Sequence, residues 1–542
     1  MSIAFNNFNI FDGTGASPNR GSILIDNGFI SDISYSSKVF EGTEKTINGE
    51  GLSLCPGLID FHSHADFVMS SDNATEYISP FLHQGITTFF GGNCGFSPFP
   101  ITNESREIVF ENSRFLQSDD FSFRWNSMEE YLSEIKNNLL LNCGFLVGHG
   151  TLRAIVMGND PSPMNNNQRQ MMSLIIRQMK EQGCFGVSLG LSYVPGIFAD
   201  EDELESLFAA VADNDMIVTI HGHTYSYASP FFNADPSKYP HNVLDARLFL
   251  SLAEKTGARL HLSHVLLKGE YTWNSCDLLL SEIEKAAKRG VDVTFGVIPY
   301  HWGNTLINTL LPKWFLEDFE GNVKDKEKVS TLASEIDKLE SQIGRYATDL
   351  FLLWGNSPYL DKYTGLSFDE IGRYEKLDYV GTILMIMQES KGKARVLTAS
   401  YSGNEGKYEK PLEALIAHPK SIIEIDAIVS SLGSAQTPAA YGGFPKLIGR
   451  YSRDRGIMKI EEAIRKITSF PASRMGASDI GEIKKGKRAD LLVFNVNEII
   501  DTNTIKNSCS TPKGIKEVWI NGQKAFSDKT NNSDKYGRIL RK

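Results

Sequence analysis

Short apolar segments recur along the middle of the chain, and a longer stretch with helical spacing follows most of them. Eight such segments are present: LCPGLIDFHSH, GITTFFGGNCG, CGFLVGHG, CFGVSLGL, DMIVTIHGH, ARLHLSH, VDVTFGVIPY and SIIEID. Intervening stretches such as EDELESLFAAVAD and LLLSEIEKAAKRG place apolar residues three and four positions apart, as an amphipathic helix does. Eight alternations of strand and helix predict an α/β fold, a closed parallel (β/α)₈ barrel of the TIM type.

The two ends of the chain carry a different pattern. IAFNNFNIFDG and GSILIDNGFISDI near the start, and ADLLVFNVNEI and KEVWINGQKAF near the end, alternate apolar and polar positions. Asn-Gly pairs within this pattern are typical of β-hairpins. We expect both ends to form one small β-sandwich domain, residues 1–55 with 477–542, which leaves 56–476 for the barrel.

One interval interrupts the strand–helix alternation. About 120 residues separate Tyr300 from Ser421, and they include the strongly helical KDKEKVSTLASEIDKLESQI. We expect a lid-like insertion at about 303–410, over the mouth of the barrel. Loops after barrel strands commonly carry specificity and lids.

Composition narrows the classes of function. The net charge of −11 over 542 residues argues against nucleic acid or an anionic membrane as the main partner. The start of the chain has no basic segment followed by an apolar one, and no apolar run approaches 18 residues. We therefore expect a cytoplasmic protein that acts on a small molecule, with its six cysteines as free thiols. A homo-oligomer is possible by analogy with other barrels.

Polar residues that bind metals fall at the carboxyl ends of the predicted strands. His62 and His64 are two positions apart, so in an extended strand both imidazoles face the same side. Cys94 lies in GGNCG, where glycines would let the backbone approach a metal closely. These are ligand types that zinc prefers.

Three further candidates follow later strands. His221 and His264 end two of them, whereas His261 lies an odd number of positions from His264 and should point elsewhere. Asp426 ends SIIEID, and a buried carboxylate costs several kcal/mol unless a partner such as a metal relieves it. The whole set predicts a site for one or two zinc ions.

The motifs resemble those of the N-acyl-D-amino-acid deacylase (D-aminoacylase) branch of the amidohydrolase superfamily. They are PGLIDFHSHAD, GGNCG, VGHGTLR, GVSLGLSYVPGIFA, YGGFPKLIGRY, ITSFPASRMG and IGEIKKGKRADLLVF, and they span nearly the whole chain. The resemblance implies a barrel with a β-sandwich made from both termini. It implies the metal ligands His62, His64, Cys94, His221, His264 and Asp426.

The same resemblance implies roles for two of these residues. Cys94 stands where other branches have the carbamylated lysine that bridges two metals. Asp426 matches the carboxylate that takes a proton from metal-bound water and passes it to the leaving nitrogen. Zinc lowers the pKa of bound water to near 7 and polarises a carbonyl, which suits amide hydrolysis.

The chain departs from the branch where deacylases hold the substrate carboxylate. The lysine two residues after the sixth-strand histidine is Leu266, and the arginine of a later Pro-His-Pro-Arg stretch is Ala439. Only the tyrosine of the Pro-Tyr pair remains, as Tyr300, and the arginine after the fifth-strand histidine is His223. Because two fixed cations are lost, we predict that the metal chemistry is retained on a different substrate.

Several residues keep more than one interpretation. The predicted substrate contacts are Tyr193, Tyr300 and His223. Tyr193 could equally be a packed aromatic, and His223 could be a proton relay, a substrate contact or an alternate ligand. His149 is expected to be structural. Lys268, Arg153 or an insertion residue could restore the lost carboxylate contacts.

The predicted function is zinc-dependent hydrolysis of a non-peptide amide C–N bond, with Asp426 as general base and acid. The first alternative keeps the metal site but closes a heterocycle of the benzoxazole type with loss of water, as amidohydrolase-like cyclases of secondary metabolism do. The second alternative is a catalytically inactive scaffold. It is disfavoured because all six ligand positions hold suitable residues.

Overall fold

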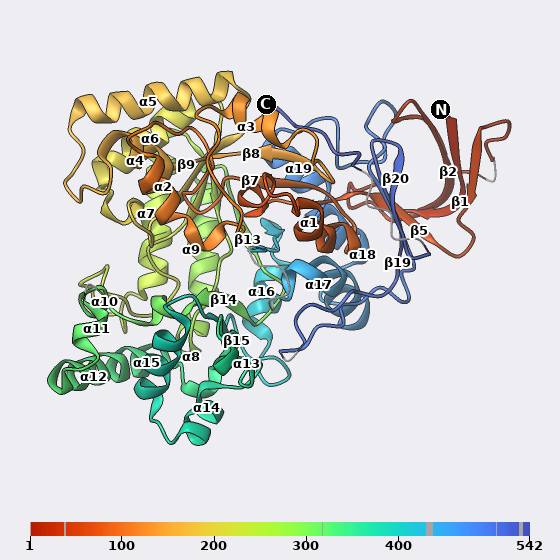
Figure 1. Ribbon diagram of the computed structural model, residues 1–542. Coiled ribbons are helices and arrows are strands. Elements are labelled where there is room, and N and C mark those ends of the chain that lie inside the picture. The colour runs from red at the N-terminus through yellow and green to blue at the C-terminus, as the bar shows by residue number, and fades with distance from the viewer. Residues whose placement is uncertain (1, 37–38, 317, 430–436, 506, 530–534) are drawn as a thin grey trace.

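The computed structural model describes residues 2–36, 39–316, 318–429, 437–505, 507–529 and 535–542. The chain forms three parts, shown in Figure 1: a barrel, a β-sheet domain to its right, and an insertion at the lower left, coloured green to teal. Within the described residues no helix is long and apolar enough to cross a membrane. No disulfide joins any of the six cysteines within the described residues.

Eight parallel strands form the barrel. They are β6 Leu58–Asp60, β7 Ile86–Gly91, β8 Asn142–Phe145 continued by β9 Val147–Gly148, β10 Gly186–Gly190, β11 Ile217–His221, β12 Arg259–Leu262, β13 Val293–Val297 and β17 Ser421–Ile423. Hydrogen bonds join them in the orders β6-β7-β8 and β9-β10-β11-β12-β13-β17. The ring closes where Ser63 and Ala427 form a parallel bridge just beyond β6 and β17. Each predicted apolar segment overlaps one of these strands, so the barrel is confirmed.

Helices cover the outside of the barrel. They include α1 Ala74–His83, α2 Arg106–Asn112, α3 Met128–Ile135, α4 His149–Met157, α5 Asn166–Glu181, α6 Glu201–Asp213, α7 His241–Thr256, α8 Glu270–Trp273, α9 Cys276–Lys288, α16 Lys410–Ala417, α17 Ala439–Lys446, the π-helical η6 Leu447–Asp454, α18 Ile460–Lys466 and α19 Ser469–Met475. Helix α6 has the bounds of the predicted helical stretch. Asp200 caps it by accepting a hydrogen bond from the Glu203 backbone N–H.

The insertion has its own sheet and its own core. Strands β14 Gly303–Leu306, β16 Arg395–Thr398 and β15 Leu350–Trp354 pair antiparallel in that order. Its helices are α10 Lys313–Leu316, α11 Phe319–Asn322, α12 Lys326–Ile343, α13 Pro358–Asp361, α14 Phe368–Glu375 and α15 Tyr379–Ser390. A separate apolar cluster that includes Leu352, Ile371 and Ile383 holds these elements together. The insertion is therefore a packed unit rather than a loose loop.

Both ends of the chain form one hydrogen-bonded sheet. Its strands are β1 Ser2–Ile10, β2 Asn19–Asp26, β3 Phe29–Ser34, β4 Lys45–Asn48, β5 Ser53–Pro56, β18 Leu491–Phe494, β19 Ile515–Ile520 and β20 Gln523–Ser527. The Asn27-Gly28 and Asn521-Gly522 pairs turn its hairpins with positive φ at both residues, as type I′ turns require.

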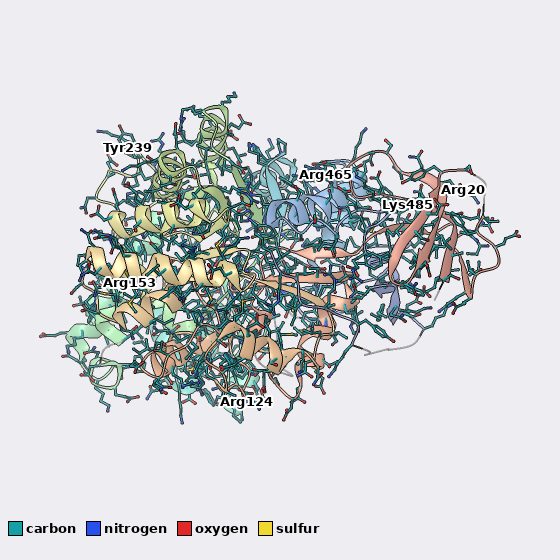
Figure 2. The ribbon with its side chains drawn as sticks, turned by 90° about the horizontal axis from the view of Figure 1, so that it is seen from above. Arg20, Arg124, Arg153, Tyr239, Arg465 and Lys485 are labelled. Atoms are coloured by element: carbon teal, nitrogen blue, oxygen red, sulfur yellow. The ribbon has the colours of Figure 1, made fainter. Side chains whose placement is uncertain are left out.

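The sheet projects from the barrel, as Figure 2 shows from above, with Arg20 and Lys485 at one end and Arg153 on the barrel at the other. The last residues return to the barrel, where the Gly537 and Leu540 amides donate to the carbonyls of Leu139 and Cys143. We propose that residues 1–55 and 477–542 form the β domain and that residues 56–476 form the barrel domain. The last residues of the chain belong to the β domain but contact the barrel.

Candidate metal centre

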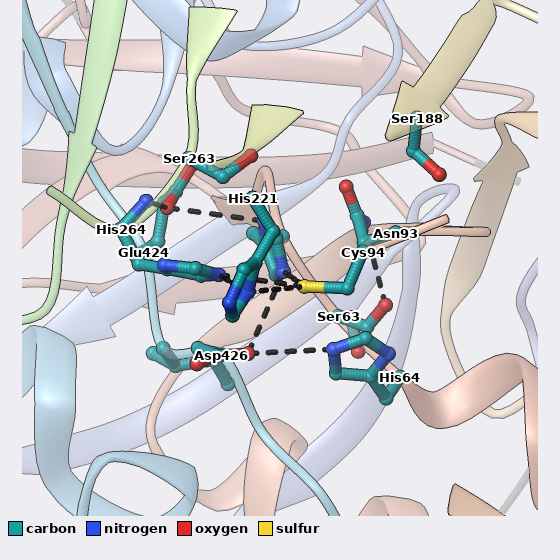
Figure 3. Close-up of polar contacts among 12 residues, drawn as sticks. Ser63, His64, Asn93, Cys94, Ser188, His221, Ser263, His264, Glu424 and Asp426 are labelled. Atoms are coloured by element: carbon teal, nitrogen blue, oxygen red, sulfur yellow. Dashed lines mark hydrogen bonds and ion pairs between the residues drawn. The ribbon is translucent and has the colours of Figure 1, made fainter. Parts of the chain in front are cut away.

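A thiol lies at the centre of a group of histidines at the barrel rim. The Sγ atom of Cys94 is 3.3 Å from His62 Nε2, 3.4 Å from His264 Nε2 and 3.4 Å from His221 Nδ1. The facing nitrogens of His221 and His264 are 3.1 Å apart. Figure 3 shows the Cys94 sulfur pointing toward the rings of His221 and His264.

A carboxylate completes the group on one side. Asp426 Oδ1 lies 3.5 Å from His62 Nε2 and 3.4 Å from His64 Nε2. Ligand atoms of His62, Cys94, His264 and Asp426 all lie within 4.8 Å of one another. The structure thus brings together all six residues that the sequence singled out. We call them the rim cluster: His62, His64, Cys94, His221, His264 and Asp426.

Three residues of the rim cluster have a strained backbone conformation. His221 is the last residue of β11, and the other members follow the ends of β6, β7, β12 and β17. Cys94, His264 and Asp426 adopt φ values of +52°, +29° and +44°. Residues with a Cβ rarely adopt such values, and they persist where the surrounding structure enforces them, often at functional sites.

The histidine pair converges for a different reason from the one predicted. Strand β6 ends at Asp60, so His62 and His64 are not in an extended strand. His64 precedes the 3₁₀ turn η1 Ala65–Phe67 with φ −113° and ψ 18°. The two rings nevertheless lie 5.4 Å apart and share one carboxylate oxygen. A turn, not the period of a strand, brings them together.

The glycines around Cys94 also serve a different purpose. A Cβ on Gly95 would lie 2.7 Å from the Gly190 nitrogen, and one on Gly190 would lie 1.9 Å from the Cys94 carbonyl oxygen. These glycines therefore let the Cys94 turn pack directly against β10. Their close approach is to a neighbouring strand.

The donor atoms of the rim cluster suit a divalent cation. Burial, followed by the nearby His264, holds the pKa of His62 and His221 well below the usual range, so both imidazoles keep a free lone pair. Burial, together with the charge of Asp426, raises the pKa of the Cys94 thiol. A cation would favour the thiolate and reverse that shift. Nitrogen, sulfur and carboxylate oxygen are the donors that zinc takes, so the residues fit zinc.

A buried glutamate supports the cluster from inside the barrel. Glu424 Oε2 accepts a hydrogen bond from the His264 backbone N–H at 2.9 Å, and Oε1 lies 2.7 Å from His261 Nε2. His261 also contacts the Thr294 hydroxyl at 2.9 Å. His261 therefore points away from the cluster, as predicted, whereas the part played by Glu424 was missed.

Asp60 supports the other side. Its Oδ1 accepts hydrogen bonds from the backbone N–H groups of His62 and Ile425, so it connects the first and last barrel strands. Burial raises the pKa of both Asp60 and Glu424. The sequence held a signal for both, because each is an acidic residue at the end of an apolar strand.

Two tyrosines border the cluster. The ring of Tyr193, a predicted substrate contact, lies 4.8 Å from the His221 ring and stacks on Phe115 at 5.8 Å. Tyr225, which the sequence did not single out, lies 5.1 Å from His221 and 5.4 Å from His264. Aromatic surface thus covers one side of the rim cluster.

The other two predicted substrate contacts have partners elsewhere. The Tyr300 hydroxyl donates to Asp501 Oδ2 at 2.9 Å. His223 lies two residues beyond the last residue of β11, and its Nδ1 is 2.7 Å from Asp245 Oδ1 on α7. Its ring stacks on Phe249 at 5.8 Å. Their roles toward substrate stay predictions.

The two basic residues that could replace the lost carboxylate-binding cations lie in different parts of the barrel. Arg153 is buried and bound to Glu203, which also contacts His149 Nε2 at 2.6 Å, so both residues brace α4 against α6. Burial lowers the pKa of Lys268 to about 7, and its charge lowers that of His221. The Lys268 backbone N–H donates to the carbonyl of Tyr225, whose ring borders His221, so of the two basic residues that the sequence singled out Lys268 is the one beside the cluster.

A cavity of about 540 Å³ opens beside Tyr193, between the barrel and the insertion. Its barrel wall includes Phe110, Phe115, Tyr193 and Ile428, and its insertion wall includes Asn304, Asn308, Trp354 and Arg395. Tyr193 lines the cavity and its ring lies 4.8 Å from that of His221, so the cavity lies beside the rim cluster. We call it the insertion cavity.

Comparison with known proteins gives consistent matches. The family model described as the amidohydrolase family matches residues 353–526. The chain is 24% identical to the N-acyl-D-glutamate deacylase of Alcaligenes xylosoxydans xylosoxydans, covering 98% of this chain and 95% of that protein.

Two solved structures each align with 100% of this chain and 99% of their own chain. One is the N-acyl-D-glutamate deacylase of Bordetella bronchiseptica, complexed with zinc and a phosphonate inhibitor that mimics the tetrahedral intermediate, with a TM-score of 0.78 and 22% identity. The other is a D-aminoacylase with a binuclear metal centre, with a TM-score of 0.78 and 21% identity. The predicted resemblance is thus confirmed: over its whole length the chain resembles the N-acyl-D-amino-acid deacylase branch of the amidohydrolase superfamily.

Proposed function

We propose that this chain is a zinc-dependent amidohydrolase that cleaves a non-peptide amide C–N bond, on a substrate other than a simple N-acyl-D-amino acid. One observation carries the proposal. His62, Cys94, His264 and Asp426 offer nitrogen, sulfur and oxygen donors within 4.8 Å of one another at the barrel rim. Barrel enzymes place their active sites at this end.

The rim cluster would hold one or two zinc ions through His62, His64, Cys94, His221, His264 and Asp426. Zinc lowers the pKa of a coordinated water to about 7 and polarises a carbonyl as a Lewis acid.

Asp426 supplies the proton transfers. Its side chain is 24% exposed, whereas those of His62 and His64 are almost fully buried, so it can reach a water or a substrate in the mouth of the barrel. We assign Oδ1 as the atom that takes a proton from the attacking water and returns it to the departing nitrogen. That return is required because an amide nitrogen is a poor leaving group until it is protonated.

The substrate assignment rests on missing cations. Leu266 and Ala439 occupy the positions of the deacylase lysine and arginine, and Ala439 is fully buried in α17. A carboxylate held by two cations in deacylases would lose charged contacts of about 1.5–3 kcal/mol each. We also propose a cytoplasmic location and a small-molecule substrate, and a homo-oligomer stays a prediction.

A panel of amides tests the proposal. Zinc-loaded and chelator-treated protein would be assayed with N-acetyl-D-amino acids, anilides and cyclic amides. We expect zinc-dependent hydrolysis of at least one anilide or cyclic amide, and little turnover of the N-acetyl-D-amino acids. Failure of the zinc-loaded protein on every amide would contradict the enzyme assignment. Efficient turnover of N-acetyl-D-amino acids would contradict the substrate assignment.

A second candidate function keeps the same site, and the aromatic wall around Tyr193 favours it. In an ortho-hydroxyanilide, the substrate's own hydroxyl could attack the activated carbonyl carbon. A C–O bond forms between the hydroxyl oxygen and the carbonyl carbon. The bond to the former carbonyl oxygen breaks, that oxygen leaves as water with the hydroxyl and amide protons, and a C=N bond completes the benzoxazole ring. Product analysis separates the two reactions: hydrolysis gives a carboxylic acid and an aminophenol, whereas cyclisation gives a benzoxazole. An inactive scaffold would bind no zinc and convert neither substrate.

A further inference from the structure

We infer that the insertion cavity binds an aryl part of the substrate that carries an anionic substituent, and that Arg395 recognises the anion. This inference rests on the proposed amide hydrolase function and names its substrate class. The barrel supplies the reacting centre, whereas the insertion supplies the residue that selects the substrate.

The wall of the cavity nearest the rim cluster is aromatic. The rings of Phe115 and Tyr193 stack at 5.8 Å with their planes 29° apart, and Tyr193 contacts His221. Trp354 lines the same cavity from the insertion. Planar groups pack well against such surfaces, and aromatic pairs contribute beyond the area that they bury. A planar substrate group beside the reacting amide fits this wall.

Among the described residues that line the cavity, one charged side chain is buried. Four charged residues line it where their side chains are exposed, two acidic and two basic, so their charges balance: Glu111, Asp119, Arg114 and Lys393. Arg395, the first residue of β16, is only 4% exposed.

That buried arginine stays charged at neutral pH. Burial lowers the pKa of Arg395 to about 10, and the charge of Asp119 acts against this shift. A guanidinium can bind a carboxylate through two parallel hydrogen bonds, and such bonds are stronger where water is excluded. An anionic group on the substrate therefore matches the interior of this cavity.

Two side-chain amides point to a polar ligand. The Oδ1 atoms of Asn304 and Asn308 are buried without a hydrogen-bond partner in the described structure, and both residues line the cavity. Both atoms are acceptors and buried polar atoms are normally paired, so a ligand that also carries hydrogen-bond donors, such as an N–H or O–H group, fits here. The volume of about 540 Å³ lies within the range of about 300–1,000 Å³ that is usual for small-molecule sites.

The test compares charged and neutral anilides. Benzanilide would be compared with 4-carboxybenzanilide and 4′-carboxybenzanilide, which place the carboxylate on the acyl ring and the amine ring. The zinc-loaded wild type and the variants Arg395→Gln, Arg395→Lys and Arg373→Gln would be assayed. Arg373 is an exposed arginine of the same insertion, paired with Asp369 on α14, and serves as the matched control.

The readout is the ratio of kcat/KM for the carboxylated anilide to that for benzanilide. We expect a wild-type ratio above one for at least one isomer, which Arg395→Gln lowers about 10- to 100-fold. Arg395→Lys should give an intermediate ratio and Arg373→Gln the wild-type ratio. A wild-type ratio of one or below for both isomers, or an unchanged ratio in Arg395→Gln, would overturn the inference.

Calorimetric binding of the same three compounds separates the inference from the proposed function. If no anilide is hydrolysed but wild type binds a carboxylated anilide more tightly than Arg395→Gln does, the cavity assignment stands and the hydrolase assignment fails. If anilides are hydrolysed with no dependence on Arg395, the reverse holds. Thermal melting identifies a variant that has not folded, and Arg395→Lys then carries the comparison.

Discussion

The rim cluster and the insertion cavity meet at Tyr193, but they are built in different ways. The rim cluster lies at the ends of barrel strands, where the buried carboxylates of Glu424 and Asp60 accept hydrogen bonds from the backbone of the strand ends. The far wall of the insertion cavity belongs to the insertion, which has its own small sheet and its own core. This difference suggests that the barrel fixes the chemistry, whereas the insertion selects the substrate.

Zinc removal should have the largest effect and should affect only one of the two regions. A chelator should reduce amide hydrolysis to background, and saturating zinc at 100 times Kd should add about 2.7 kcal/mol to the free energy of unfolding. Hydrogen exchange should increase at the barrel rim and not in residues 303–398. An equal increase in the insertion would show that the two regions are not independent.

Asp426→Asn should follow in size. The amide cannot accept the proton, so kcat should fall about 10²- to 10⁴-fold while zinc content stays near that of wild type. The preference among substrates should not change, because that preference belongs to the insertion. Asp369→Asn, in the insertion, is the control and should keep wild-type kcat. A loss of zinc as large as the loss of kcat would instead make Asp426 mainly a ligand.

Glu424→Gln should have a smaller effect on the same region. Glu424 orients His264 through its backbone N–H and contacts His261, so the variant should lower zinc affinity about 10- to 100-fold. Zinc titration followed by activity measures this. Glu129→Gln on the surface helix α3 is the control. A zinc affinity equal to that of wild type would show that Glu424 does not support the metal site.

Matched truncations of buried side chains should have the smallest effect on kcat. They should distinguish the role of the barrel from that of the insertion most clearly. Ile383→Ala in α15 and Leu260→Ala in β12 each remove a fully buried side chain, at a cost of about 2–5 kcal/mol. Ile383→Ala should raise KM more than it lowers kcat, because it loosens the insertion. Leu260→Ala should lower kcat or zinc content, because His264 lies just beyond the end of its strand. The same kinetic change in both variants would contradict the division of roles.

Much of the fold could be predicted because barrel strands are buried on both faces and read as apolar runs. The two Asn-Gly turns marked hairpins at the ends for an equally local reason. The sheet of the insertion could not be predicted in this way. Its strands β14 and β16 pair across a long stretch of chain, and no local pattern specifies such a pairing.

The site divides along the same line. The six members of the rim cluster could be selected because they follow apolar strands. Left-handed backbone at Cys94, His264 and Asp426 could not be predicted, because none of these residues is a glycine. The contact between Tyr300 and Asp501 joins residues 201 positions apart. Arg395 lines the insertion cavity because the pairing of the insertion sheet places it there. Such placements depend on tertiary structure.

X-ray absorption at the zinc edge tests the central claim most directly, because it reports whether sulfur is bound to the metal. In zinc-loaded wild type we expect a zinc–sulfur distance of about 2.3 Å beside nitrogen and oxygen ligands. In Cys94→Ser, with the other five cysteines intact, that distance should disappear. Zinc bound only by nitrogen and oxygen in wild type, or a sulfur signal that persists in Cys94→Ser, would contradict a metal centre built on the rim cluster.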